Sequence, residues 1–289
     1  MAVGDLVTSY WDLEFNGLAF GGETDFGVTS ITGLAGMPNI QPSDRPRLLR
    51  DGLYAGQDFL LERRVAMTVE VFGSDVSAFS TNLQAFNLAM APGGAEKPLV
   101  MYVPGMCNNN KFMLWARPRR RVVPVDRLWF YNVPVMNIEF VATDPRLYSL
   151  AQYSQALTLP QALGGAQFDM TFDLQFGGGV AGGDEILNNA GTYKTSPVFK
   201  IIGPVINPAL ENITTGKKFK MDITVLAGDY LIVDMSQRTV MLNGTASRYS
   251  NVVKTSEFWD LEPGDNTVVY SAAGYTVSTA TATWRDAWV

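Results

Sequence analysis

The sequence contains no histidine and only one cysteine, Cys107. Without histidine the chain lacks the most common general base and the most common metal ligand, and no Ser-His or Cys-His nucleophile pair can form. A single cysteine excludes an internal disulfide and the usual zinc sites. We therefore expect no catalytic residue, no cofactor site and no metal site. We expect Cys107 to be a small buried or loop thiol rather than a nucleophile.

Long apolar runs are also missing. No segment approaches the roughly 18 consecutive apolar residues that a membrane-spanning helix needs. The first residues, MAVGDLVTSYWDLEF, have neither a basic start nor an apolar stretch of the kind that marks a protein for secretion. We therefore expect no membrane insertion, and the single cysteine suits assembly in a reducing cytoplasm.

The chain is acidic, with a formal net charge of −6 over 289 residues. Residues 1–150 carry 13 Lys and Arg against 15 Asp and Glu, a net charge of −2; residues 151–289 carry 9 against 13, a net charge of −4. Such a protein is poorly suited to hold nucleic acid by its phosphates. Its like charge could instead keep DNA from adhering to a surface that surrounds it.

A strongly alternating segment, VPVMNIEFVATDPRLY at residues 133–148, divides the chain. Its apolar residues occupy every second position, which predicts a β-strand with one buried face formed by Met136, Ile138, Phe140 and Ala142. The pattern stops at Asp144-Pro145, because proline fixes its own backbone and restricts the residue before it. An arginine-rich strand-and-helix unit precedes this stop, and short strands with glycine turns follow it. We therefore predict two domains, residues 1–150 and 151–289.

The first domain is predicted to be mainly β with one α-helix. Strands are expected at residues 10–15, 28–34, 64–73, 98–103 and 111–117. The helix follows Ser74 and Asp75, whose side chains can cap its free amides, and it ends before Pro92. Its apolar residues recur at three- and four-residue steps, which predicts one buried face made of Val76, Phe79, Leu83, Phe86 and Met90.

Residues 36–60, GMPNIQPSDRPRLLRDGLYAGQDFL, form a long connection with three prolines and no regular period over most of its length. A long irregular segment inside a compact domain is unusual and is often functional. Two interpretations are open. The segment is either an arm that docks on a neighbouring molecule or a surface loop held against its own domain.

The only dense run of charge is RPRRR at residues 117–121. A basic run of this kind can contact nucleic acid. However, no aromatic platform flanks it and the surrounding domain is acidic. A solvated face or a salt-bridged contact between subunits is therefore the favoured interpretation.

The second half of the chain predicts almost only strands. They are expected at residues 168–176, 218–225, 230–234, 239–242, 258–261, 267–270 and 275–284. Asn243-Gly244 is a strong signal for a two-residue hairpin turn. Short strands at this spacing predict an antiparallel β-sandwich or jelly roll.

Glycines 177, 179 and 182 match the G-x-G-x-x-G pattern of dinucleotide-binding loops. The context does not fit, because the following residues leave no room for the crossover helix that should hold the pyrophosphate. No acidic residue stands near Ile202 to bind a ribose. We interpret the segment as a flexible loop.

Several segments, taken in order, resemble the distal tail proteins of long-tailed, non-contractile bacteriophages. In the first half they are RDGLYAGQDFLLERRVAMTVEVFG (residues 50–73) and FVATDPRLYS (residues 140–149). In the second half they are FGGG, NNAGTYKTSPVFKIIGP, NITTG, AGDYLIVD, VMLNG, WDLEPGDN and WRDAW. Each match is weak alone, whereas the ordered set is specific and covers most of the chain.

The resemblance implies a structural component of the virion rather than an enzyme. Members of this family form a hexameric ring between the tail tube and the host-recognising tip, at the distal end of the tail. Their tail-tube-like first domains line a channel through which DNA passes without specific binding, and their galectin-like β-sandwich domains lie outside. The implied partners are five further copies, the tail tube protein and the tail-tip (baseplate hub) protein, with the tape measure protein as a further candidate.

Two other functions compete with this one. The sandwich could be a carbohydrate-binding module for the host surface, because exposed aromatic side chains such as Tyr230, Tyr249, Trp259 and Tyr275 can stack on sugars. A glycoside hydrolase would need two carboxyl groups roughly 5 to 9.5 Å apart across a cleft, and Asp260 and Glu262 are the nearest candidates. Two acids beside a Pro-Gly turn are ordinary hairpin surface, so the hydrolase is the weakest of the three.

Overall fold

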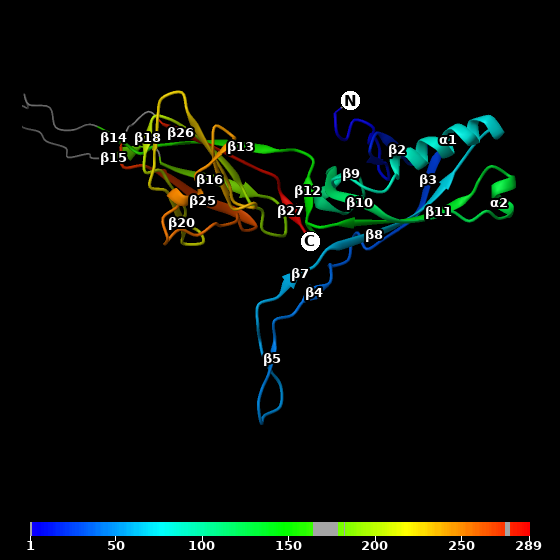
Figure 1. The fold of residues 1–289 in the computed structure, drawn as a ribbon, viewed down its shortest axis with the longest axis horizontal. Helices are drawn as coiled ribbons and strands as arrows, with labels where there is room; N and C mark the ends of the chain where they lie inside the picture. The colour runs from blue at the N-terminus through cyan, green and yellow to red at the C-terminus, as the bar shows by residue number, and fades with distance from the viewer. Residues whose placement is uncertain (1, 164–178, 182, 275–277) are drawn as a thin grey trace, which may run out of the picture. The chain divides into compact units, whose positions relative to one another are not determined.

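The computed structural model describes residues 2–163, 179–181, 183–274 and 278–289, and it divides the chain into two compact units (Figure 1). The first unit is Met1–Leu150 with Trp288–Val289, and the second is Ala151–Ala287. Antiparallel sheets are the main secondary structure of both units, which confirms the predicted mainly β fold. The expected strand at residues 168–176 and glycines 177 and 182 lie outside the described residues.

The first unit is built on a nine-stranded antiparallel sheet, whose main path is β2-β1-β9-β10-β11-β8-β3. Its strands are β1 (Leu13–Phe15), β2 (Leu18–Phe20), β3 (Phe26–Thr32), β8 (Arg63–Val71), β9 (Lys97–Met101), β10 (Phe112–Val122), β11 (Val135–Ala142), β12 (Leu147–Ser149) and β27 (Ala287–Trp288). The long strand β10 joins the two halves of the sheet, because its first part pairs with β9 and its second part with β11. The short strand β2 was not predicted.

Two neighbouring strands, β11 and β8, alternate as the sequence predicts. In β11 the four predicted apolar residues are all buried, and the strand ends at Ala142, just before Asp144-Pro145. β8 alternates in the same way and pairs with β11 along its length. The opposite face is polar, and a row of side-chain hydrogen bonds crosses it from Ser30 to Thr68 and from Thr68 to Asn137, each 3.0 Å long.

Helix α1 (Val76–Ala89) covers the apolar face of this sheet. Its N-cap is Asp75, as predicted, and the carboxylate accepts a 2.8 Å hydrogen bond from the amide of Ala78. Phe79 and Phe86 are buried, but Val76 is exposed, so its assignment to the buried face is wrong. Val76 lies at the start of the helix, one turn before the first residue that the core covers. A second helix, α2 (Arg127–Phe130), is one turn long and was not predicted.

The N-terminal residues cover part of the other face of the sheet. Val7 packs there with Val100 and Met113 in a small second core. The strand expected at residues 10–15 is shorter than predicted and begins at Leu13, because Trp11 has a φ of 74°, which no strand residue adopts.

Residues 36–60 form an extended hairpin, which we call the arm. It contains two short ladders, β4 (Ile40–Gln41) with β7 (Phe59–Leu60) and β5 (Arg45–Pro46) with β6 (Leu53–Tyr54). In Figure 1 the arm projects away from the sheet that carries it.

The second unit is a β-sandwich. One sheet has the order β13-β26-β17-β22-β23-β24, and the other has the order β16-β25-β19-β20. The first sheet contains β13 (Tyr153–Thr158), β17 (Val198–Ile202), β22 (Tyr230–Asp234), β23 (Thr239–Leu242), β24 (Ala246–Ser247) and β26 (Thr279–Trp284). The second contains β16 (Asp184–Asn189), β19 (Ala209–Asn212), β20 (Lys217–Lys220) and β25 (Gly264–Ser271). Buried side chains from both sheets form one continuous core.

Two short ladders and two 3₁₀ turns complete the described structure. The ladders are β14 (Gln161–Leu163) with β15 (Gly179–Ala181), and β18 (Val205–Ile206) with β21 (Thr224–Val225). The 3₁₀ turns are η1 (Cys107–Asn109) and η2 (Tyr249–Asn251).

The hairpin at Asn243-Gly244 is present, since both residues have positive φ and the turn joins β23 to β24, but Leu242 pairs with Ala246, so the loop has three residues instead of the predicted two. Two predicted strands are wrong. Residues 218–225 are interrupted between β20 and β21, and residues 258–261 form only an isolated bridge from Leu261 to Thr195. Alternation alone could not show these interruptions, because the buried positions persist across them.

The Asp144 carboxylate, just after β11, accepts hydrogen bonds from two nearby side chains. Arg146 donates from Nη2 to Asp144 Oδ2 at 2.7 Å, and the Tyr148 hydroxyl donates to the same oxygen at 2.7 Å. Burial alone would raise the pKa of Asp144, but the hydrogen bonds and charge of Arg146, with the Tyr148 hydroxyl, outweigh it and hold the pKa below its ordinary value.

A depressed pKa predicts acid-dependent stability. The stabilisation from Asp144 is complete above the pKa that the group has in the unfolded chain, and it is lost as pH falls through the lower pKa of the folded state. Asp144→Asn should therefore lower the free energy of unfolding at pH 7 and flatten its decline below about pH 4. Urea unfolding at a series of pH values measures this. If the free energy of unfolding declined with pH in the same way for the wild type and the variant, the proposed role of Asp144 would be contradicted.

Candidate functional site

The arm is the most exposed feature of the first unit. Every residue from 39 to 59 is exposed, including the apolar Ile40, Leu48, Leu49, Leu53, Tyr54 and Phe59. A loop held against its own domain would bury such side chains, so that interpretation is wrong. Apolar groups gathered on a projecting element are typical of a surface that another molecule covers.

Arg63 fixes the base of the arm. Its side chain is 1% exposed, and its guanidinium donates to the carbonyl oxygens of Gly33 (3.1 Å), Leu34 (2.7 Å), Gly36 (2.7 Å) and Pro145 (2.7 Å). The first three carbonyls belong to the chain entering the arm, and Pro145 follows β11. One side chain therefore joins the entrance of the arm to β8 and to the segment after β11.

Glycine is required at the point where the chain enters the arm. Gly33 has a φ of 78°, and a Cβ atom there would lie 2.0 Å from the carbonyl oxygen of Arg64. No side chain fits in that space, and the backbone conformation itself favours glycine. The arm therefore leaves the sheet at a fixed place.

Further contacts hold the two strands of the arm together. A Cβ atom on Gly56 would lie 2.3 Å from the carbonyl oxygen of Ser43, so only glycine allows the strands to approach this closely. The Asp44 carboxylate accepts a 2.8 Å hydrogen bond from the Gly56 amide. The arm is thus an ordered element despite its exposure.

Cys107 lies near Arg63 and is buried, as predicted. Burial raises the pKa of Cys107 to about 12, although the charge of Arg63 acts in the opposite direction. The thiol is therefore protonated at neutral pH and is a poor nucleophile. Burial also lowers the pKa of Arg63, which nevertheless stays charged because its ordinary value lies far above neutrality.

The basic run of residues 117–121 lies within strand β10, rather than beyond the strand as predicted. Three of its arginines, Arg117, Arg119 and Arg120, line an open depression of about 520 Å³ together with Arg64, Glu62 and Glu139, whereas Arg121 donates to the Asn87 carbonyl of α1 at 3.5 Å. Arg64 forms ion pairs with Glu62 (3.0 Å) and with Glu139 (3.3 Å). Most of the run therefore belongs to a mixed-charge face, in keeping with the solvated-face interpretation.

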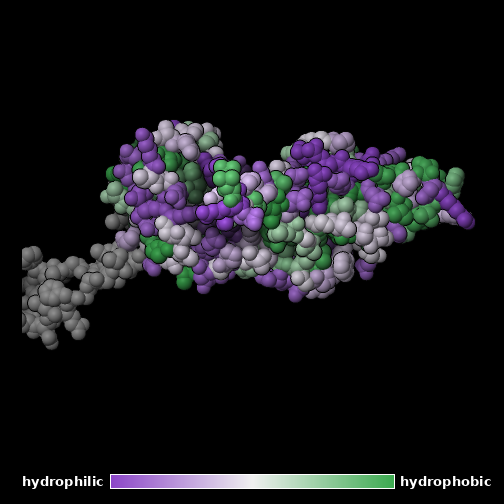
Figure 2. All heavy atoms as spheres, turned by 90° about the horizontal axis from the view of Figure 1, so that it is seen from below, coloured by the Kyte–Doolittle hydropathy of each residue, from purple (hydrophilic) through white to green (hydrophobic). Residues whose placement is uncertain are grey.

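Hydrophobic side chains also gather at the end of the first unit where α1 and α2 lie (Figure 2). The exposed apolar residues of these elements and of the loop before α2 are Val76, Leu88, Val125, Leu128 and Phe130. Only Trp129 turns inward from α2, and it packs edge-on against Phe79 at 5.4 Å. This surface is a second candidate for contact with another protein.

The aromatic residues considered for sugar binding do not form one platform. Trp259 is 1% exposed and packs against Phe199 in the sandwich core. Tyr230 is half-buried beneath the ammonium of Lys200, 4.5 Å from the ring centre. Tyr249 is exposed and stacks on Phe258 at 6.2 Å. Tyr275 lies outside the described residues.

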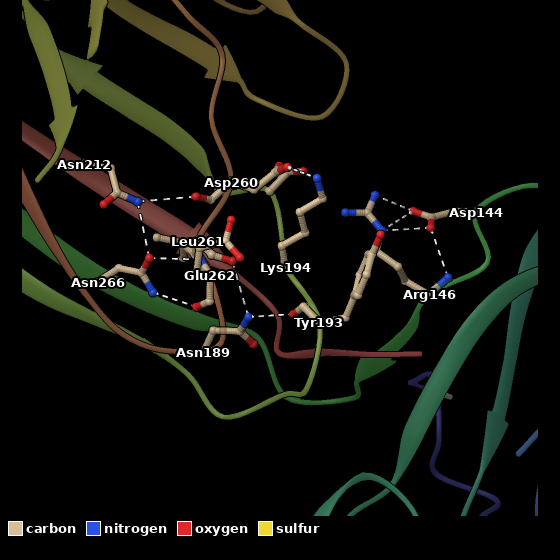
Figure 3. A network of polar contacts seen from close by, with 11 residues as sticks. Asp144, Arg146, Asn189, Tyr193, Lys194, Asn212, Asp260, Leu261, Glu262 and Asn266 are labelled. Atoms are coloured by element: carbon tan, nitrogen blue, oxygen red, sulfur yellow. Dashed lines mark hydrogen bonds and ion pairs between the residues drawn. The ribbon is translucent and has the colours of Figure 1, made fainter. Parts of the chain in front are cut away.

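The carboxylates considered for hydrolysis lie on a structurally constrained segment, shown in Figure 3. Asp260 accepts a hydrogen bond from Ser196 and forms a 3.8 Å ion pair with Lys194. The backbone around Glu262 is held by buried Asn266, which accepts from the Glu262 amide at 2.9 Å and donates to the Glu262 carbonyl at 2.8 Å. Asp260 and Glu262 therefore lie in a folded corner that buried asparagines stabilise.

Two more buried asparagines hold the same corner. Asn212 donates to the carbonyl of Asp260 at 3.3 Å, and Asn189 donates to the carbonyl of Tyr193 at 2.8 Å and to that of Leu261 at 3.4 Å. These residues lie in or beside the NNAG, NITTG and WDLEPGDN segments, so those segments have a structural role. Buried amides with satisfied hydrogen bonds fix a backbone conformation.

Among the described residues, no group of three or more acidic or cysteine side chains could hold a metal ion. No helix in this part of the chain is long and apolar enough to cross a membrane.

Arg63 was missed at the sequence level, although a signal for it was present. The predicted strand began one residue later, but the alternation of Val65, Met67 and Val69 continues backwards to Arg63 and places it on the buried face. An arginine in phase with a buried face predicts a buried, multiply hydrogen-bonded guanidinium.

Arg63→Lys tests this role. Lysine presents a point charge and cannot reach four separate carbonyls with the planar geometry of arginine. We expect the variant to lose roughly 2–4 kcal/mol of stability through unmade hydrogen bonds. Hydrogen exchange of residues 33–37 should accelerate as well. Arg64→Lys, on the exposed side of the same strand, is the matched control and should change neither the stability nor the exchange rate. Equal effects of the two substitutions would contradict the role of Arg63 in fixing the base of the arm.

Comparison with known protein families matches residues 190–288 to the siphovirus-type tail component, C-terminal domain (SPP1_Dit). Among curated protein sequences none matches. Among solved structures, the Dit protein (gp 19.1) of phage SPP1, described as a paradigm of the hub adsorption apparatus in phages that infect Gram-positive hosts, aligns with a TM-score of 0.68 at 12% identity. The alignment covers 97% of this chain and 100% of that one. At this identity the likeness concerns the fold.

Two chains from baseplate structures in the activated conformation also align. The chain from the phage P2 baseplate with Ca has a TM-score of 0.47 and 8% identity, and it covers 90% of this chain and 91% of that one. The chain from the phage p2 baseplate with Sr has a TM-score of 0.48 and 9% identity, and it covers 94% and 97%. Residues 190–288 therefore match the C-terminal domain family of siphovirus-type tail components, and the resemblance of this chain to the distal tail proteins of siphophages is confirmed.

Proposed function

We propose that this chain is a structural component of a phage tail tip, in which six copies form a ring that joins the tail tube to the host-recognition tip. The observation that carries the proposal is the match of residues 190–288 to a tail-component domain, together with the likeness in fold to SPP1 Dit over nearly the whole chain. The proposed location is the distal end of the virion tail, after assembly in the host cytoplasm. We propose no catalytic, cofactor-binding or metal-binding role.

The two units would have different tasks. The first is proposed to be a tail-tube-like, ring-forming domain with residues 1–150, and the second a galectin-like sandwich with residues 151–289. The arm supports ring formation, because it is ordered at its base yet exposed along its length. A rigid element that projects from a domain and exposes apolar side chains is suited to contact a neighbouring subunit.

The charge of the chain supports passage of DNA without binding. Each copy has a formal net charge of −6, so a ring of six would repel a polyanion overall. Arg117, Arg119 and Arg120 share their face with the carboxylates of Glu62 and Glu139, which reduce its net positive charge. Proposed partners are the tail tube protein, the tip or baseplate hub protein and, as a further candidate, the tape measure protein.

Removal of the arm tests the proposal. Native mass spectrometry of the purified chain should find a species with six times the 31.6 kDa protomer mass. Replacement of residues 39–59 by a short Gly-Ser linker should abolish that species and leave the thermal unfolding temperature of the protomer nearly unchanged, because these residues add no core. A wild-type chain that stays monomeric at high concentration and in tail preparations would contradict the proposed hexameric ring. A hexamer that persists without the arm would overturn the role of the arm.

A carbohydrate-binding module is the alternative, favoured by the exposed ring of Tyr249, which stacks on half-buried Phe258. An aromatic face in water can stack on a sugar ring. Full-length wild-type protein and the Tyr249→Ala variant can be compared on a glycan array. Binding that the substitution abolishes would favour the module, and absence of binding at millimolar sugar would dismiss it.

A further inference from the structure

Two large apolar residues of the first unit, Trp11 and Leu49, have left-handed backbone conformations. Their φ angles are 74° and 64°, whereas most other non-glycine residues with positive φ in the described chain are asparagines. This conformation is strained for a bulky side chain and persists only where surrounding structure maintains it. Both side chains are nevertheless exposed, Trp11 by 59% and Leu49 by 103%. Strain combined with exposure points to a contact outside the chain.

The conformation of Trp11 is held by its neighbours. Its amide donates a 2.7 Å hydrogen bond to the carbonyl of Tyr102, whose own amide donates to the carbonyl of Asp12 at 3.1 Å. The Asp12 carboxylate in turn accepts from the amides of Thr8 (2.9 Å) and Ser9 (2.6 Å). The indole is therefore presented on a fixed backbone, as in the preorganised anchors of protein interfaces.

A depression of about 280 Å³ lies beside this indole. We call it the Trp11 socket, and it is lined by Trp11, Leu13, Val28, Thr29, Ser30 and Ile31. Four of these six side chains are apolar, so the socket suits an aliphatic group better than a charged one.

The tip of the arm offers such a group. Leu48 and Leu49 are adjacent and, at 90% and 103% exposure, are the most exposed apolar side chains of the described chain. They lie in a turn that the Arg47 amide closes by donating to the Gly52 carbonyl at 3.2 Å. Two leucines in full contact with water gain free energy when another apolar surface buries them.

The arm tip and the surface around the Trp11 socket carry opposite charges. Residues 1–43 contain no lysine or arginine and five carboxylates, of which only Glu14 is buried, and Asp12 adjoins Trp11. Gly21 packs against Asp12, which places the loop bearing Glu23 and Asp25 beside it. The arm tip, RPRLLR at residues 45–50, contains three arginines and no acid, although Asp44 and Asp51 flank it. Opposite charges around an apolar contact favour association and fix its register.

The arm does not reach the socket of its own chain. In Figure 1 the arm leaves the sheet on one side, whereas the N-terminal segment, dark blue beside the label N, lies on the other. A projection and a recess at different places on one molecule give a heterologous contact, which closes into a ring when the rotation between copies is suitable.

We propose that Leu48 and Leu49 at the arm tip of one copy occupy the Trp11 socket of a neighbouring copy. The inference rests on the proposed ring and names the two surfaces that make its contact. Arginines of the tip then face the acidic N-terminal segment of the neighbour, and the contact weakens as salt concentration rises.

Disulfide trapping between two separately prepared proteins tests this contact. One protein carries Leu49→Cys and the other Ser30→Cys, and Cys107 is buried in both. After mixing and mild oxidation we expect a disulfide-linked pair, formed at least about tenfold faster than with Ser80→Cys, an exposed serine on α1 that serves as the matched control. The rate should fall with added NaCl.

The outcomes separate the two proposals. Hexamers that assemble with no preference for Ser30→Cys over Ser80→Cys would overturn the socket contact and leave the ring intact. A chain that forms no oligomer would overturn the ring itself, and the socket contact with it. Leu48→Ser combined with Leu49→Gly provides a second measurement, because both positions are exposed and glycine accepts a positive φ. A folded double variant that still assembles at wild-type concentrations would also overturn the contact.

Discussion

The buried guanidinium of Arg63 is the interaction on which the shape of the first unit depends. It satisfies four backbone carbonyls that come from two distant parts of the chain, the entrance of the arm and the segment after β11. A charge removed from water is tolerated only when several polar groups surround it. Because these groups are carbonyls of the main chain, the interaction fixes backbone positions as well as a side chain. These hydrogen bonds therefore fix the place where the exposed arm leaves the well-packed sheet.

The chain uses the same principle in its second unit, with amides in place of a guanidinium. Buried asparagines 189, 212 and 266 hold the corner that precedes β25. Of the acidic side chains in that corner, Asp260 contacts Ser196 and Lys194, and Glu262 is exposed to solvent. In both units, buried polar side chains therefore fix the backbone of loops. Large exposed apolar groups are found at the arm and at the α1–α2 end, where contacts with other proteins are expected.

Much of the fold could be predicted from alternation and capping. The strand containing Phe140, the helix capped by Asp75 and the hairpin at Asn243-Gly244 all follow from local rules, and all three are present. Local rules failed where tertiary contacts decide, as at Val76 and in the interrupted strand after Lys220. The exposure of the arm could not be derived, because its sequence fits a packed loop equally well. The Trp11 socket could not be predicted from the sequence, because two separate segments line it. The left-handed backbone of Trp11 also follows no sequence pattern.

The central claim is that this chain acts through surfaces that it shares with other copies of itself at the end of a phage tail. Electron cryomicroscopy of virions with an epitope tag on this chain measures that most directly. The account predicts tag density at the distal end of the tail, in a ring with one tag on each of six equivalent subunits. Density elsewhere on the particle, or a solitary copy without a neighbour, would contradict it.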